Sequence, residues 1–372
     1  DPQSGDLMHL PHPPKDIKLL HIGTPGAEHV PTEVHGEHGG YGISEPGFLD
    51  RDDVAAALDG HADADYIRAH LGEHPDLVRT LADPANDYLT RSLLDNPKTL
   101  ASLLKHPEAI PILEDAVHEV NERGYQVIDD VEHQGVEPFD PTPEQAEVSA
   151  DVAAIAADAP EVLQVHESFD QSRIGDPEYC RQWVAEERER WPENQGTLNR
   201  ITERIAGETD GHAGFRPEPK DDVRALAKIA KRNWDGSLLH DLVGAKIQFE
   251  QVADMYRALD AVRNDPELTI VDFSDRLANP QDSGYRDLQL NVRLPNGHVA
   301  ELRLHLTHID EVASYEHALY EVRRDFETFS KKDGREGFLS PEEAALDAAL
   351  TEQVRGRFEE AFRQGLASEE SS

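Results

Sequence analysis

The chain has 372 residues, and its 75 acidic residues outnumber its 36 lysines and arginines, which gives a formal net charge of −39. No apolar run approaches the roughly 20 residues that span a bilayer, and this excludes a transmembrane protein. Cys180 is the single cysteine, so a disulfide framework and a cysteine-based zinc site are also excluded. A surface this acidic repels nucleic acids and anionic membranes, so a polyanion must meet a local basic cluster.

The two ends of the chain differ in pattern from its middle. Residues 1–50 are rich in Pro, Gly and His without periodicity, which predicts a linker or a disordered arm. Residues 51–133 predict a helical module of unknown role, because Pro75, Pro97 and Pro107 each mark the first turn of a helix. Residues 134–170 predict a linker and a helix. Residues 336–372 predict a helix that begins with Ser340 as its N-cap, followed by a frayed tail.

A basic stripe follows in the middle of the chain. We expect a helix over residues 221–233, on which basic residues recur every four positions, at Lys220, Arg224, Lys228 and Arg232. Like charges at this spacing destabilise an isolated helix, so the pattern favours an anionic partner such as a phosphate chain. A solvated basic face paired with neighbouring acids is the alternative interpretation. Asp241 comes just before a predicted strand over residues 245–249, where it could serve as a turn residue or project from the mouth of the strand.

Two further strands form a predicted hairpin. Apolar residues occupy the even positions of 288–294 and 300–306, and polar residues the odd ones, which is typical of half-buried strands. A three-residue loop that ends with Gly297 in a left-handed conformation gives the register that pairs even with even. This register predicts a polar face with three opposed pairs: Asn291 with Glu301, Gln289 with Arg303, and Asp287 with His305. A lone carboxylate among basic residues suits metal and phosphate chemistry.

Two candidate ligand contacts flank this hairpin. Tyr285 follows Gly284 at a loop-to-strand junction, where its ring could stack on a base or close the edge of the sheet. Residues 311–329 predict a helix whose apolar stripe faces a core, with His317 on another face.

Together these segments resemble the synthetase domain of the RelA/SpoT family, which makes the alarmone nucleotides (p)ppGpp. The resemblance covers about residues 190–330 and implies an α+β fold, a mixed β-sheet with flanking helices, for a domain over residues 171–335 that follows the α-helical region. It rests on five segments in the family's order: Lys220–Lys228, Asp241–Ile247, Asn279–Arg286, Val299–Arg303 and Tyr315–His317.

The resemblance also implies a reaction and a site. The β,γ-pyrophosphate of ATP would pass to the 3′-hydroxyl of GDP or GTP, with Mg²⁺ as the cofactor. Asp241 and Glu301 would be the catalytic, metal-binding acids. The remaining implied contacts are Lys220, Arg224 and Lys228 to ATP, and Tyr285, Lys246, His305 and His317 to the acceptor.

Several positions depart from the family pattern. Glu218 stands where the family often has Arg, Lys246 and His305 replace arginines, and a lysine is missing near Gln281. These changes resemble a divergent branch in which some members are toxin domains. A toxin of the same chemistry, acting on adenine nucleotides or on a tRNA 3′ end, is therefore one alternative, and a non-catalytic nucleotide-binding module is another. Other nucleic acids and membranes are not expected partners. With no leader sequence visible, we expect a cytoplasmic site of action, and export as a toxin fragment stays open.

Overall fold

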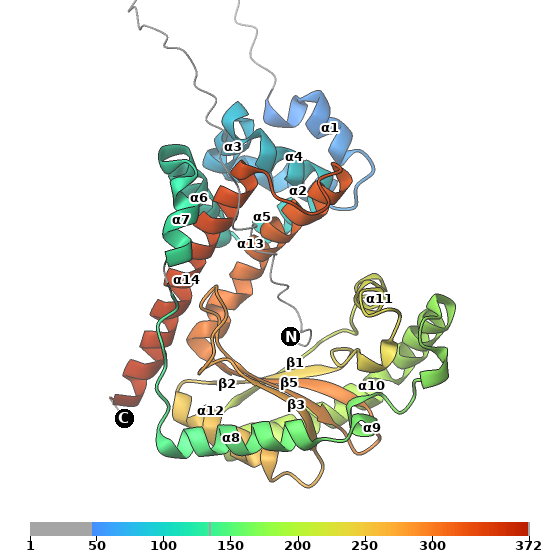
Figure 1. Cartoon of the computed structure of the whole chain (residues 1–372). Coiled ribbons are helices and arrows are strands. Elements are labelled where there is room, and N and C mark those ends of the chain that lie inside the picture. The colour runs from blue at the N-terminus through green and yellow to red at the C-terminus, as the bar shows by residue number, and fades with distance from the viewer. Residues whose placement is uncertain (1–46, 134, 371–372) are drawn as a thin grey trace, which may run out of the picture. The chain divides into compact units, whose positions relative to one another are not determined.

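The computed structural model of the chain describes residues 47–133 and 135–370 (Figure 1). The predicted arm at residues 1–50 lies outside this range except for its last four residues. Packing divides the chain into two units, Asp1–Val127 with Ala318–Asp347, and Ile128–His317 with Ala348–Ser372. These limits differ from the predicted ones at 170 and 335, because α13 (Thr307–Lys332) and α14 (Pro341–Glu370) each contribute residues to both units.

The first unit is helical, as the sequence predicts. Its short helices are α1 (Asp52–Leu58), α2 (Ala64–His70), α3 (Pro75–Ala82), α4 (Asp87–Asp95), α5 (Pro97–Lys105), α6 (Ala109–Arg123) and the start of α7 (Gln126–His133). Proline opens α3 and α5, whereas α6 begins two residues after Pro107. Buried Asp325 of α13 accepts a hydrogen bond from Asn96 Nδ2 (2.9 Å) at the start of α5, and so joins the last helices to the first ones.

The second unit is built on a mixed sheet of five strands. In spatial order these are β1 (His212–Phe215), β2 (Gly244–Phe249), β5 (Val299–Leu306), β4 (Leu288–Arg293) and β3 (Thr269–Asp275). The pair β2 and β5 is parallel, and the other neighbours are antiparallel. The predicted α+β fold, a mixed sheet with flanking helices, is therefore confirmed.

Helices cover one face of this sheet. Three of them, α8 (Pro143–Asp158), α10 (Pro177–Glu208) and α12 (Val252–Arg263), lie beneath it in Figure 1, and the short α9 (Glu161–Gln164) follows α8. The even-numbered apolar side chains of β4 and β5 are buried, as predicted. In the parallel pair, Gly244, Lys246 and Gln248 stand beside Glu301, Arg303 and His305. The register thus collects polar side chains from neighbouring strands on the other face.

The predicted hairpin register is confirmed. Asn291 pairs with Glu301 and Gln289 with Arg303, while Asp287 lies one residue before β4. Leu294 N donates to His298 O (2.8 Å) across the three-residue loop, and Gly297 has a φ of 83°. This left-handed backbone is accessible to Gly at little cost and strained for other residues.

We expect Gly297→Ala to destabilise the protein by about 1–2 kcal/mol, since alanine pays for the left-handed conformation. The added methyl group would also meet Glu167, which pairs with Arg293 (3.0 Å). Urea unfolding measures the change. Gly196→Ala is the control, because Gly196 lies in α10 with open space around it and alanine there should stabilise by about 0.5–1 kcal/mol. Equal effects of the two substitutions would contradict the assigned turn.

Candidate active site

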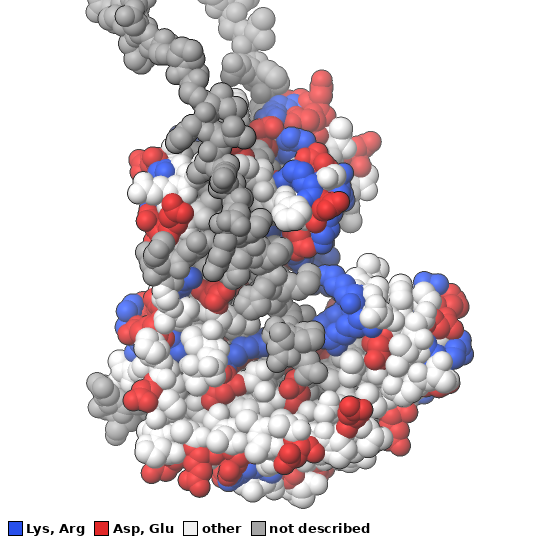
Figure 2. Space-filling view, viewed as in Figure 1, with Lys and Arg blue, Asp and Glu red and all other residues white. Residues whose placement is uncertain are grey.

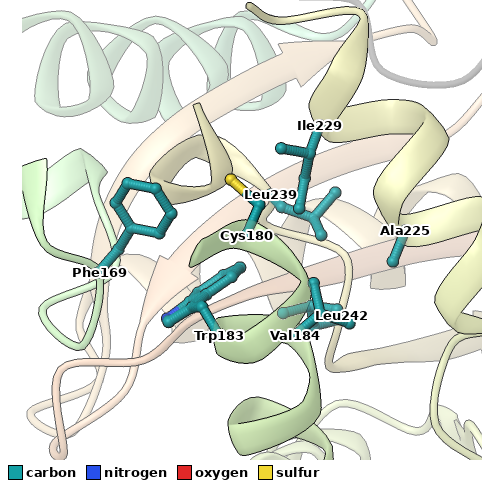
Figure 3. Packing of buried hydrophobic residues seen from close by; sticks show 8 residues of the cluster. All are labelled: Phe169, Cys180, Trp183, Val184, Ala225, Ile229, Leu239 and Leu242. Carbon is teal, nitrogen blue, oxygen red and sulfur yellow. The ribbon is translucent and has the colours of Figure 1, made fainter. Parts of the chain in front are cut away.

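An apolar cluster fixes the helix α11 (Asp222–Ala230) and the following loop against α10 (Figure 3). Its members come from all three segments and from the turn before α10: Phe169, Cys180, Trp183, Val184, Ala225, Ile229, Leu239 and Leu242. Gly236 packs so closely on Phe169 and Trp183 that an added Cβ would lie 2.7 Å from the Phe169 ring. The cluster therefore holds the segment that carries Asp241 at a set distance from α11.

Asp241 is the centre of the first half of the site. Its side chain is buried in the turn before β2, with the residue only 4% exposed. Lys220 Nζ and Lys228 Nζ both donate to its Oδ2, the latter at 3.0 Å, and Arg216 Nη1 donates to its backbone oxygen at 2.5 Å. Burial alone raises the pKa of Asp241, but the charges of Lys228 and Lys220 outweigh it and hold this pKa well below the usual range.

Two residues of the basic stripe thus find their anionic partner within the protein, in the carboxylate of Asp241. Lys220 precedes α11, whose N-cap is Asp221, and Lys228 lies in its last turn, and both donate to the same oxygen of Asp241. Arg224 is exposed on the helix, and Arg232 donates to the backbone oxygen of Leu238 in the loop before Asp241. Figure 2 shows basic side chains gathered beside α11, whereas acidic ones are scattered over the region of α8.

Glu301 is the centre of the second half. It lies on β5 beside Gly244, and its backbone N–H donates to Val243 O (3.1 Å), so both acids stand where β2 and β5 begin. Arg303 forms a two-pronged pair with it, Nε to Oε1 at 3.0 Å and Nη2 to Oε2 at 3.1 Å. Gln289 Nε2 donates to Oε2 at 2.8 Å. Each predicted metal-binding acid is therefore held by cationic side chains.

Tyr285 is packed more deeply than the sequence suggested. The residue is 7% exposed, its ring meets Phe358 edge to face with centroids 5.6 Å apart, and its hydroxyl donates to Asp287 Oδ2 (2.8 Å). Because the hydroxyl satisfies the fully buried carboxylate of Asp287, replacement of Tyr285 by phenylalanine would leave that carboxylate without this donor.

Lys246 and His305 meet on one carboxylate that the sequence did not single out. Lys246 Nζ lies 2.5 Å from Asp310 Oδ2, and His305 Nδ1 lies 3.4 Å from Asp310 Oδ1. Burial lowers the pKa of His305. An acid in the first turn of a helix was the available signal for Asp310. His317 lies two turns further along α13, on an exposed position.

The acids fit a divalent metal that arrives with phosphates. Mg²⁺ in nucleotide sites commonly takes one or two carboxylates and completes its shell with phosphate oxygens and water. Asp241 Oδ1 is buried without a hydrogen-bond partner in the described part of the chain, so a ligand position is available on it. No group of three His, Cys, Asp or Glu residues suited to a metal occurs among the described residues.

Comparison with known proteins bears on this site directly. Residues 219–323 match the model of the region found in RelA/SpoT proteins. This segment of the chain is similar to the RelA/SpoT region. The predicted resemblance is confirmed, and the RelA/SpoT region contains all nine predicted site residues, from Lys220 to His317.

Individual relatives are distant and match only in part. The GTP pyrophosphokinase rsh of Brucella melitensis is 23% identical over 135 residues, which are 36% of this chain and 18% of that protein. The GTP pyrophosphokinase YwaC of Bacillus subtilis is 28% identical over 89 residues, 22% of this chain and 42% of that protein. The chain thus spans less than half the length of these relatives. The crystal structure of small alarmone synthetase 2 from Bacillus subtilis is 22% identical, with a TM-score of 0.33 over 41% of this chain and 89% of that one.

Among the described residues no helix is both long enough and apolar enough to cross a membrane.

Because Lys220 and Lys228 share Asp241 as their acceptor, we predict that their removal lowers the free energy of unfolding in a non-additive way. We expect Lys220→Met and Lys228→Met each to cost about 1–2 kcal/mol, because one lysine still pairs with Asp241. The double variant should cost about 3–5 kcal/mol and more than the sum of the two measured single effects, since it leaves a buried carboxylate without these cations. Adding Asp241→Asn to the double variant should restore most of the loss. Urea unfolding of the four variants checks this, and additive single effects without rescue would contradict the pairing.

Two buried histidines, His166 and His298, lie close together, and the half-buried His240 immediately precedes Asp241. His166 Nε2 lies 2.8 Å from Leu239 O, and His240 Nε2 lies 2.6 Å from Gln164 O, so each ring donates to a backbone carbonyl. His298 Nδ1 lies 3.2 Å from Glu187 Oε2, and the His166 and His298 rings are 4.5 Å apart. Burial lowers the pKa of His240 to about 4, from a reference of 6.5. Folding therefore keeps His240 neutral where the unfolded chain takes up a proton.

This depressed pKa predicts a loss of stability in weak acid. The contribution of His240 to the free energy of unfolding is fully present above pH 6.5. It falls as the pH drops toward 4, and about 3 kcal/mol is lost over this range. His240→Gln, which keeps a donor for Gln164 O, should flatten the dependence of urea midpoints on pH in this window. His212→Gln, at an exposed position of β1, is the control and should leave the slope unchanged. If His240→Gln left the slope intact, the assignment of a neutral imidazole to His240 in the folded protein would be contradicted.

Proposed function

We propose that the chain is an ATP:nucleotide 3′-pyrophosphotransferase that moves the β,γ-pyrophosphate of ATP to the 3′-hydroxyl of GDP or GTP. The observation that carries this proposal is the pairing of Asp241 with Lys220 and Lys228 beside Glu301, at the edge where β2 and β5 begin. The RelA/SpoT region around these residues, and relatives named GTP pyrophosphokinases, support it.

On the donor side, Lys220 and Lys228 would exchange Asp241 for phosphate oxygens of ATP. Phosphate attracts the same ammonium groups, and the apolar cluster keeps α11 in place while the partners change. Arg224, on the exposed side of α11, would meet the outer part of the nucleotide. Pyrophosphate transfer asks a protein mainly for positioning and for neutralisation of phosphate charge, which these residues supply.

Asp241 and Glu301 would hold Mg²⁺, which when bound neutralises phosphate charge and favours deprotonation of the attacking 3′-hydroxyl. Asp241 Oδ1 offers a buried oxygen with an open position, and the Glu301 carboxylate stands on the neighbouring strand. Replacing the lysine partners of Asp241 by a metal keeps this buried carboxylate compensated throughout.

On the acceptor side, Tyr285, Lys246, His305 and His317 would position the receiving nucleotide. Lys246 and His305 share Asp310, so an incoming phosphate would compete with that carboxylate for them. Tyr285 is fixed by its bond to Asp287, so its ring is already oriented before a base arrives.

The reaction itself is the direct test. ATP labelled at the γ-phosphate is incubated with the protein and Mg²⁺, and GDP, GTP, ADP, ATP or tRNA is offered as acceptor. We expect label on the guanine nucleotide together with release of AMP. Label on an adenine nucleotide or on tRNA would identify the toxin-like alternative of the same chemistry. Binding of ATP without AMP release for any acceptor would identify a non-catalytic nucleotide-binding module.

We predict that Asp241→Asn and Glu301→Gln each reduce AMP formation by at least a thousandfold, because a lost metal ligand removes several kcal/mol of charge stabilisation in the transition state. Glu311→Gln is the matched control: Glu311 is exposed in the first part of α13, and its substitution should leave turnover unchanged. Urea unfolding verifies that each variant is folded. Turnover near that of the unmodified protein in either acid variant would remove that acid from the site.

A further inference from the structure

Arg303 binds the carboxylate of Glu301, which is one of the two proposed metal ligands. Its side chain lies on the polar face of β5 and is 24% exposed. The guanidinium places Nε 3.0 Å from Oε1 and Nη2 3.1 Å from Oε2 of Glu301, so it engages both oxygens at once. Planar, two-pronged binding of this kind is the preferred geometry of arginine with a carboxylate. Glu301 is thus neutralised within the protein before any ligand arrives.

The other acid near Arg303 does not depend on it. Asp287 Oδ2 lies 4.0 Å from Arg303 Nη1, beyond hydrogen-bond distance. Asp287 instead accepts from the Tyr285 hydroxyl (2.8 Å) and from Arg276 Nη1 (3.3 Å). Glu301 keeps a second, uncharged donor in Gln289 Nε2 (2.8 Å). The charge of Arg303 therefore serves Glu301 above all, and its removal leaves neither acid without a donor.

We propose that Arg303 is a positioning residue that competes with the divalent cation for Glu301 and so makes metal binding depend on nucleotide. The proposal rests on the proposed function in one respect, that metal and nucleotide share this site. When a cation takes Glu301, the guanidinium must leave it or remain beside a like charge. A phosphate group at the same place gives the released guanidinium a new acceptor.

Two effects of opposite sign follow. Without nucleotide, removal of the guanidinium should strengthen divalent-cation binding, because the competitor is gone. The same removal should weaken binding of ATP, because a phosphate loses a donor. A residue that merely supported the fold would weaken both or change neither. Metal and nucleotide should then bind with positive coupling in the unmodified protein, and the coupling should shrink in the variant.

Mn²⁺ titration followed by electron paramagnetic resonance tests the proposal without turnover. We expect Arg303→Gln to bind Mn²⁺ at least fivefold more tightly than the unmodified protein in the absence of nucleotide. With a saturating non-hydrolysable ATP analogue, the difference should fall below twofold. Arg303→Lys, whose ammonium can hold one oxygen at a time, should show an intermediate gain and provides a second reading if the glutamine variant does not fold.

Arg293→Gln is the matched control. Arg293 lies on the neighbouring β4 and donates to Val165 O (3.0 Å) and Glu167 Oε2 (3.0 Å) rather than to Glu301, so its loss should leave Mn²⁺ affinity unchanged. Unchanged or weaker Mn²⁺ binding in the folded Arg303 variants would overturn the proposal. An unmodified protein that binds Mn²⁺ but transfers no pyrophosphate would refute the proposed function alone, whereas an active protein without the gain in affinity would refute only the role of Arg303.

Discussion

The candidate site depends on one buried carboxylate held by two lysines. Asp241 is taken out of water in the turn before β2, and a buried charge of this kind is stable only while cations and donors compensate it. Lys220 and Lys228 supply that compensation from either end of α11. The apolar cluster between α10, α11 and the loop holds both partners in reach, and Arg216 secures the backbone of the turn. Without the lysines, the burial of Asp241 would destabilise the folded protein, and without the apolar cluster the lysines would not be held within reach of it.

Both acids are paired with cationic side chains, an arrangement that would suit an enzyme that transfers phosphate groups. Asp241 is paired with two ammonium groups and Glu301 with a guanidinium, so both acids are compensated by cations within a chain of net charge −39. In the proposed reaction, a metal would replace the cationic side chains on the two acids, and phosphate groups would replace the acids as partners of those side chains. If both ligands entered together, no charge would be left uncompensated, whereas either ligand alone would leave one. Lys246, His305 and Asp310 repeat the arrangement on the side assigned to the acceptor.

The local parts of this structure could be predicted from the sequence, and the tertiary parts could not. Alternation with period two, with Gly297 at the end of a three-residue loop, determined which residues of β4 face which residues of β5. The strand β1 has four residues without alternation and was not predicted. The pairing of Lys220 and Lys228 with Asp241 joins residues 21 and 13 positions apart, and no periodic pattern contains it. Asp310 acts 64 positions from Lys246, across the parallel pair β2 and β5, and only the fold brings them together.

A crystal structure of the protein with Mg²⁺ and a non-hydrolysable ATP analogue tests the central claim most directly. The account predicts that Lys220 and Lys228 leave Asp241 and donate to phosphate oxygens, while Asp241 and Glu301 bind the metal and α11 stays packed on its apolar cluster. A nucleotide bound with both lysines still on Asp241, or a metal held by other residues, would contradict it.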